Sequence, residues 1–208
     1  MMKRRISFYV NLIYGLAFPT QESNLMMILR SFSIQLGHSH TLATISGDDI
    51  AMGQALLAEV EEKCYPGLRV EDTAKLMSEA LKSCNGGNGL LSLATIIAGV
   101  DEEGRKVFLL DGKGKLRRGV RYGTGSGSAI AMVNMDRYRR LDTSVKRATK
   151  IAKRAICRAG DEARESGGFA DGYHIRRYGW EKVFGDLPIL DMVKARCNKI
   201  DDRPSPDL

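Results

Sequence analysis

The apolar and polar positions of this sequence first predict two consecutive amphipathic helices. Apolar residues recur at three- and four-residue spacing from Ile50 to Cys64 and again from Val70 to Cys84, which is the period of a helix with one packed face. Asp48 and Asp49 precede the first helix, where acidic side chains complement the helix dipole. The glycine-rich segment Asn85–Gly89 ends the second helix.

Strands are predicted on both sides of this helix pair. They are short, apolar and rich in β-branched residues, and the segments between them carry the Asp and Gly residues typical of hairpin turns. The predicted strands are Thr41–Ile45, Leu90–Val100, Lys106–Leu110 and Leu116–Tyr122, with turns at Asp101–Gly104 and Asp111–Gly114. The last three strands are therefore expected to form an antiparallel meander.

A second pair of helices is expected after the glycine-rich turn Gly123–Ser128. The first is short, over Ala129–Met135, and the second is capped by Asp142–Ser144 and runs to about Glu165. A closing hairpin of Phe169–Ile175 and Trp180–Val183 follows. Two helix pairs inserted between groups of strands favour a layered α+β sandwich.

The front of the chain is harder to assign. A basic start, Met1–Arg5, precedes an apolar run, Ile6–Phe18, and a second apolar run covers Leu25–Leu36. This outline suits a secretory signal, although the bulky Phe18 stands where a cleavage site needs a small residue, and the first run is too short to span a bilayer as a helix. A buried strand or helix and a poorly ordered extension are the other two interpretations.

Composition and charge exclude little. The net charge is +7 and the pI about 9.3, which can indicate a nucleic acid or membrane partner. The basic residues are spread over several segments without a nucleic-acid-reading motif, so we expect neither partner. Those of the long rear helix, Lys146, Lys150, Lys153, Arg154 and Arg158, are expected to form an ordinary solvated face.

No metal site or cofactor is expected. The four cysteines, Cys64, Cys84, Cys157 and Cys197, are too widely spaced for a zinc motif, and we interpret them as reduced, mostly buried thiols of an intracellular protein. His38 and His40 have no acidic or thiol neighbour that completes a metal site. His174 and Trp180 are expected to serve packing.

Short motifs along the chain carry a family resemblance through their order and spacing. They are the strand-and-glycine turn Thr44–Gly47, the "AGxD" hairpin Ala98–Asp101, the "DxxGxxxxG" hairpin Asp111–Gly119, the "GSGS" turn Gly125–Ser128, the helix Arg139–Ala155 and the "SGG" turn Ser166–Gly168. From about Thr44 to Ile175 the chain resembles proteasome β subunits, most of all the chymotrypsin-like catalytic type. The fold that this implies is the four-layer α-β-β-α sandwich of the N-terminal-nucleophile hydrolases, here with its first strand pair atypical or absent.

The same resemblance implies where a catalytic site would lie. In that family a threonine exposed by cleavage after a glycine is the nucleophile, with a lysine and an acid beside it. Before Gly47 the sequence has no Gly-Thr pair, no aspartate and only one lysine, Lys3, so we expect no catalytic residue to be retained. By resemblance, Gly47 matches the glycine whose N–H binds the oxyanion, and Ser126 and Ser166 match two serines that brace the site.

Each of these three matches also has a plainer interpretation, as a residue that a turn or a helix end requires. The family's aspartate position is occupied by Ala163. Asp161 lies two residues away, about 200° around a helix, and is interpreted as a surface carboxylate.

The expected domain organisation is a divergent N-terminal segment (1–43), a proteasome β-type domain (44–185) and a C-terminal tail (186–208). The resemblance implies a core-particle subunit homologue in proteasomal protein degradation, in the cytoplasm and nucleus, with other proteasome α and β subunits and polypeptide substrates as partners. We expect it to lack catalytic activity of its own. Two alternatives stay open: an active threonine endopeptidase whose N-terminal segment is not represented here, and a truncated product that folds poorly.

Overall fold

The computed structural model describes residues 15–19, 25–29, 33–35, 41–65, 67–85, 91–138, 143–162 and 169–188. The expectations for His38, His40, Cys197, Ala163, Ser166 and the tail beyond residue 188 lie outside these residues.

The described residues form ten strands in two five-stranded sheets, and neighbouring strands in each sheet pair antiparallel. The first sheet has the order β10-β9-β2-β1-β8 and the second the order β3-β4-β5-β6-β7. The strands are β1 (Gly15–Pro19), β2 (Leu25–Leu29), β3 (Ser33–Gln35), β4 (Thr41–Gly47), β5 (Leu93–Asp101), β6 (Gly104–Asp111), β7 (Leu116–Gly119), β8 (Tyr122–Thr124), β9 (Phe169–Arg176) and β10 (Gly179–Pro188).

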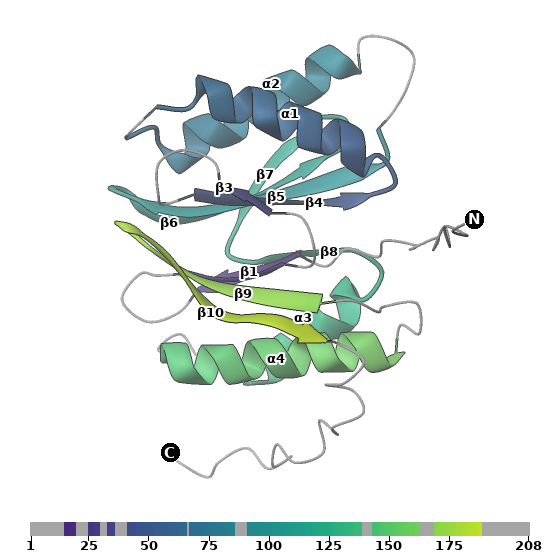
Figure 1. Cartoon of the computed structure of the whole chain (residues 1–208), viewed down its shortest axis with the longest axis vertical. Coiled ribbons are helices and arrows are strands. Elements are labelled where there is room, and N and C mark those ends of the chain that lie inside the picture. The colour runs from purple at the N-terminus through teal and green to yellow at the C-terminus, as the bar shows by residue number, and fades with distance from the viewer. Residues whose placement is uncertain are drawn as a thin grey trace, which may run out of the picture.

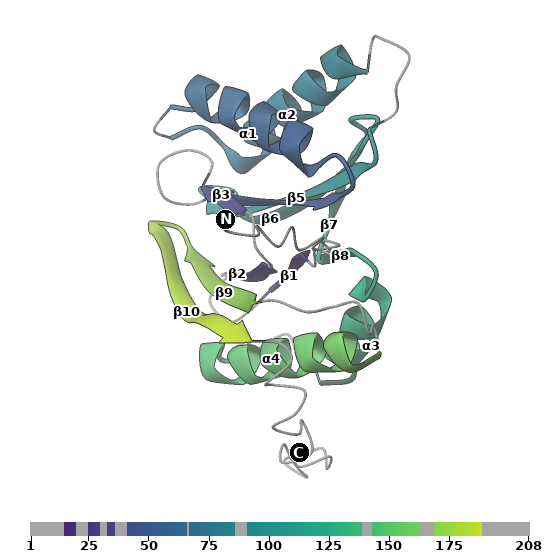
Figure 2. The same ribbon diagram turned by 45° about the vertical axis from the view of Figure 1, so that its right-hand side comes forward.

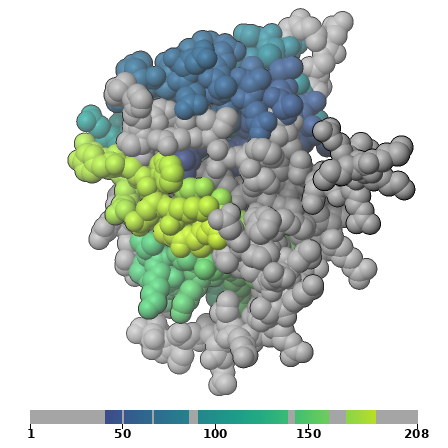
Figure 3. Space-filling view, viewed as in Figure 1, coloured from purple at the N-terminus to yellow at the C-terminus, as the bar shows by residue number. Residues whose placement is uncertain are grey.

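Two helix pairs cover the outer faces of the sheets. Helices α1 (Ile50–Lys63) and α2 (Val70–Cys84) lie on the second sheet, and α3 (Ser128–Tyr138) and α4 (Val145–Glu162) lie on the first. The two sheets face each other between the helix layers, as both ribbon views show (Figures 1 and 2). In the space-filling view the first helix pair forms one end of the molecule, and β9, β10 and α4 lie towards the other (Figure 3). The predicted α+β, four-layer sandwich is confirmed.

The front of the chain supplies strands to both sheets. Strand β1 pairs with β2 from Gly15↔Leu29 to Pro19↔Leu25, and the pair lies between β8 and β9. Of the two alternatives for the first strand pair, absence is wrong. The apolar runs there have the composition that a strand buried between layers requires. The first sheet thus contains residues from both sides of the boundary that we drew at residue 43.

The predicted strand Leu116–Tyr122 is wrong as one element. The chain forms β7 in the second sheet, leaves it at the exposed residue Val120, and enters the first sheet as β8. A Cβ at Gly119 would come within 2.7 Å of the Tyr122 ring, so the glycine lets the ring fold back against the strand end. Tyr122 then packs between the sheets, and the meander ends with β7.

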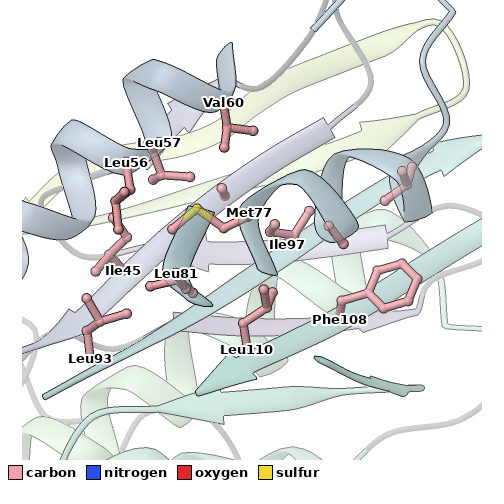
Figure 4. Packing of buried hydrophobic residues seen from close by; sticks show 13 residues of the cluster. Ile45, Leu56, Leu57, Val60, Met77, Leu81, Leu93, Ile97, Phe108 and Leu110 are labelled. Carbon is pink, nitrogen blue, oxygen red and sulfur yellow. The ribbon is translucent and has the colours of Figure 1, made fainter. Parts of the chain in front are cut away.

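Three apolar clusters fill the three gaps between the four layers. One lies between α1, α2 and their sheet and includes Leu57, Met77, Ile97 and Phe108 (Figure 4). A second lies between the sheets, around Ile96 and Ile175, and a third lies under α3 and α4. Alternation along β5 explains the division, because Ile97 faces the helices and Ile96 the other sheet.

Two details of the expected surface differ. Arg154 of α4 is only 6% exposed, and its guanidinium lies 4.2 Å from the centroid of the Tyr138 ring, so it belongs to the packed side of the helix and not to the solvated face. Cys84 is exposed, whereas Cys157 is buried, and Cys64, Cys84 and Cys157 are all free thiols. None of the described helices has the length and apolar character that crossing a membrane requires.

A buried ion cluster ties α2 to the β5–β6 hairpin. Lys106, with a fully buried side chain, lies 3.1 Å from Asp101 and 2.5 Å from Glu103. Asp101 also accepts a hydrogen bond from the backbone N–H of Val70, the first residue of α2. Burial alone would lower the pKa of Lys106, but the hydrogen bonds to Glu103 and Asp101 outweigh it and raise that pKa. The lysine is therefore a protonated structural group at neutral pH.

The substitution Lys106→Met is expected to lower the free energy of unfolding by about 3 kcal/mol, because it leaves the carboxylate of Asp101 buried without its counter-charge. Urea denaturation at neutral pH measures this. The double variant Asp101→Asn/Lys106→Met should recover much of the loss, since the amide keeps an acceptor for the Val70 N–H. A loss in the double variant as large as in the single one would contradict this account.

Candidate functional site

Gly47 ends strand β4 in a conformation that only glycine adopts comfortably. Its φ is +129°, and a Cβ there would overlap the carbonyl oxygen of Ser92. The same carbonyl accepts a hydrogen bond from the N–H of Asp48, at 2.8 Å. The glycine therefore lets the end of β4 lie directly against the residue before β5.

The two aspartates after Gly47 hold the start of β5. Asp49 accepts a hydrogen bond from the backbone N–H of Ser92 at 2.6 Å, and Asp48 accepts one from the Ser92 hydroxyl at 2.9 Å. Asp49 is the N-cap residue of α1, yet its side chain makes no capping bond within the helix. The sequence pattern explained both acids by the helix dipole alone. It did not predict their hydrogen bonds to Ser92, because Ser92 is more than forty positions away in the sequence.

An open groove lies beside these hydrogen bonds, and its lining residues come from segments of both sheets. It is lined by Ser46 and Gly47 from the end of β4, by Leu91, Ser92, Leu93 and Ala94 at the start of β5, and by Gly125 after β8. The structure thus brings the predicted glycine, Gly47, to the same groove as the "GSGS" turn. Ser126 follows Gly125 and is exposed, but it is not among the residues that line the groove.

The start of β1 also reaches this end of the molecule. Gly15 pairs with Thr124, the neighbour of Gly125, whereas Pro19 pairs with Leu25 at the other end of the strand. The two ends of β1 are separated by roughly 13 Å at the rise of an extended chain. The sequence given in front of this strand, residues 1–14, contains no threonine.

The described threonines do not fit the nucleophile's place. Thr20 lies outside the described residues. Thr41 and Thr44 lie inside β4 with buried side chains, and Thr124, the threonine of the Gly123-Thr124 pair, is also buried. The hydroxyls of Thr44 and Thr124 have no hydrogen-bond partner among the described residues, so no base activates either of them.

No titratable side chain lines the groove within the described part of the chain. The buried lysine of the structure, Lys106, pairs with Gly99 of β5, which is six residues from Leu93. That is roughly 20 Å along the strand, at the far end of the sheet. The described lining residues therefore offer backbone and hydroxyl groups, which can bind an oxyanion or a peptide.

The remaining candidates have structural roles. His174 is 3% exposed, and its Nδ1 lies 3.2 Å from Glu181 on the neighbouring strand. Trp180 packs edge-on against Tyr173 at a centroid distance of 5.2 Å. Among the described residues no group of three or more His, Cys, Asp or Glu side chains is arranged to hold a metal ion. The Asp161 side chain lies outside what the structure describes.

Comparison with known proteins agrees with this architecture. The family model described as "Proteasome subunit" matches residues 83–175. The chain is 37% identical over 119 residues to proteasome subunit beta type-5-B of Arabidopsis thaliana. The matched region covers 57% of this chain and 43% of that protein. It is 34% identical over 150 residues to proteasome subunit beta type-8 of Rattus norvegicus, covering 69% of this chain and 54% of that protein. The chain belongs to the proteasome β-subunit family.

This chain spans about half the length, or less, of the curated proteasome subunits that it matches. The family match covers β5 to β9 with both rear helices and includes the turn at Gly125. Gly47 lies in front of the matched residues of the family model, so its role in a proteasome subunit's site stays a prediction, as do those of Ser126 and Ser166.

The substitution Gly47→Ala is expected to lower the free energy of unfolding by about 2–4 kcal/mol, because it adds backbone strain and pushes Ser92 away. Gly67→Ala is the matched control. Gly67 also has a positive φ, +88°, but a Cβ there meets nothing within 4 Å, so only about 1 kcal/mol of strain is expected. Thermal or urea unfolding compares the two variants. Equal losses would show that the approach of Gly47 to Ser92 does not matter.

Proposed function

We propose that this chain is a β-type subunit of a proteasome core particle that contributes to protein degradation by assembly, without hydrolysing peptide bonds itself. The observation that carries the proposal is the pairing of Gly15 with Thr124, since it brings the start of β1 to the groove beside Gly125. Residues 1–14 contain no threonine, and no titratable side chain is among the described residues that line the groove.

The partners that we propose are other proteasome α and β subunits in a hetero-oligomeric ring. The relatives compared above are proteasome subunits, and together with the four-layer sandwich they support this proposal. The two helix layers are the natural contact surfaces, because they form the outer faces of the molecule. Polypeptide substrates would then be those of the assembly, and we propose a location in the cytoplasm and nucleus.

The alternative function is that of an active chymotrypsin-like threonine endopeptidase whose catalytic segment is not represented in this sequence. It is favoured by the groove itself, where Gly47 offers its backbone next to Gly125. In that case Gly47, Ser126 and Ser166 would form part of a pocket shell around a nucleophile supplied by further chain.

A fluorogenic peptide with a bulky apolar residue before the cleaved bond distinguishes the two functions. The purified chain is expected to show no turnover above buffer, and Thr20→Ala and Thr124→Ala are expected to change nothing. Thr124→Ala should keep the fold, since the hydroxyl that it removes has no hydrogen-bond partner. Turnover that disappears in either variant would contradict the proposal.

Assembly is tested by expressing the tagged chain in its source cells and separating extracts on native gels. We expect the tag to migrate with core particles that contain other proteasome subunits. Met52→Lys on α1 should reduce this incorporation, because it charges an exposed apolar side chain (46% exposed) of a helix layer. Val120→Lys, which charges a 59% exposed apolar side chain between β7 and β8, is the matched control. A tagged chain that folds but never leaves the monomer fraction would overturn the proposal.

A further inference from the structure

A second hollow lies between the two rear helices and is lined by three arginines. Its walls are Val133, Asn134 and Arg137 from α3 and Arg154 and Arg158 from α4. Arg154 and Arg158 are one helical turn apart, as are Val133 and Arg137, so each helix turns these side chains to one face. Among the described residues that line the hollow, none is acidic.

Two of these arginines, Arg137 and Arg158, are placed to receive an anion from outside. Arg154 is held by packing, with its guanidinium 4.2 Å from the Tyr138 ring centroid. Arg158 is half-buried and Arg137 exposed at the rim, and neither has a carboxylate partner among the described residues. The amide nitrogen of Asn134 donates to the carbonyl of Ile130 at 3.0 Å, so the guanidinium groups set the charge of the site.

The positive charge is concentrated on this layer and is not simply the net charge of the protein. Helices α3 and α4 together contain seven basic and three acidic residues, whereas α1 and α2 contain three basic and six acidic residues. The two outer layers thus carry opposite net charge. On α4 the basic residues are Lys146, Arg147, Lys150, Lys153, Arg154 and Arg158.

We propose that the hollow between α3 and α4 binds a carboxylate-rich segment of a partner protein. Guanidinium groups bind carboxylates through paired, charge-assisted hydrogen bonds, and Arg137 and Arg158, one on each helix, match two acidic side chains. Val133, 65% exposed at the rim, offers an apolar contact that a polypeptide uses and a phosphate backbone does not. The aromatic face nearby, that of Tyr138, is already covered by Arg154, so no stacking platform favours single-stranded nucleic acid. This assignment goes beyond the proposed function and does not depend on it.

Fluorescence anisotropy with a labelled oligoglutamate peptide tests the proposal on the purified full chain. The variant Arg137→Gln/Arg158→Gln is expected to weaken binding at least about tenfold, since each charge-assisted hydrogen bond contributes on the order of 1 kcal/mol or more. The matched control, Arg117→Gln/Arg118→Gln, removes the same charge from exposed positions of β7. It should change the affinity by less than about twofold. Thermal unfolding checks that both variants remain folded.

Three results would overturn the proposal. Equal weakening in both variants would mean that the peptide senses only the net charge. Equal binding of an oligoglutamine peptide would mean that carboxylates are not recognised. Tighter binding of single-stranded DNA of the same charge, lost in the same variant, would assign the hollow to nucleic acid instead. None of these results bears on assembly or peptidase activity, so the two proposals fail separately.

Discussion

Both faces of each sheet have to be buried, and this requirement governs the rest of the structure. Each sheet packs one face on two helices and the other on its partner sheet, so three apolar clusters separate four layers. Strand β5 illustrates the constraint, because Ile96 and Ile97 are both fully buried although they point to opposite sides. A polar face on any of the inner strands would remove the apolar contact that holds one layer against the next.

The same requirement explains what the front of the chain does. Without β1 and β2, the first sheet would end at β9 and β8 would have no partner in it. The segments GLAFP and LMMIL supply strands that are apolar throughout, which suits a place between a helix layer and a second sheet. A sequence that diverges in its chemistry can therefore keep the fold, because the position demands apolar strands and not particular side chains.

Local patterns predicted the elements well where one period dominates. The bounds of α2, Val70–Cys84, follow from its apolar spacing and from the glycines after it. The pattern failed where tertiary contacts decide, as at Val120, where the chain changes sheets, and at Arg154, which lies over Tyr138. At the groove, Gly47 was predictable from its turn, but the bonds of Asp48 and Asp49 to Ser92 depend on which strands become neighbours.

The register of β1 and β2 has a consequence for how the protein folds. The second sheet is largely built from neighbouring strands, whereas β1 meets β8, and β2 meets β9, across roughly a hundred residues or more of intervening chain. Closing such long loops costs entropy before any contact repays it. The first sheet therefore cannot be completed before β9 and β10 have been synthesised. An apolar strand edge that waits for its partner is open to pairing with other chains during that interval.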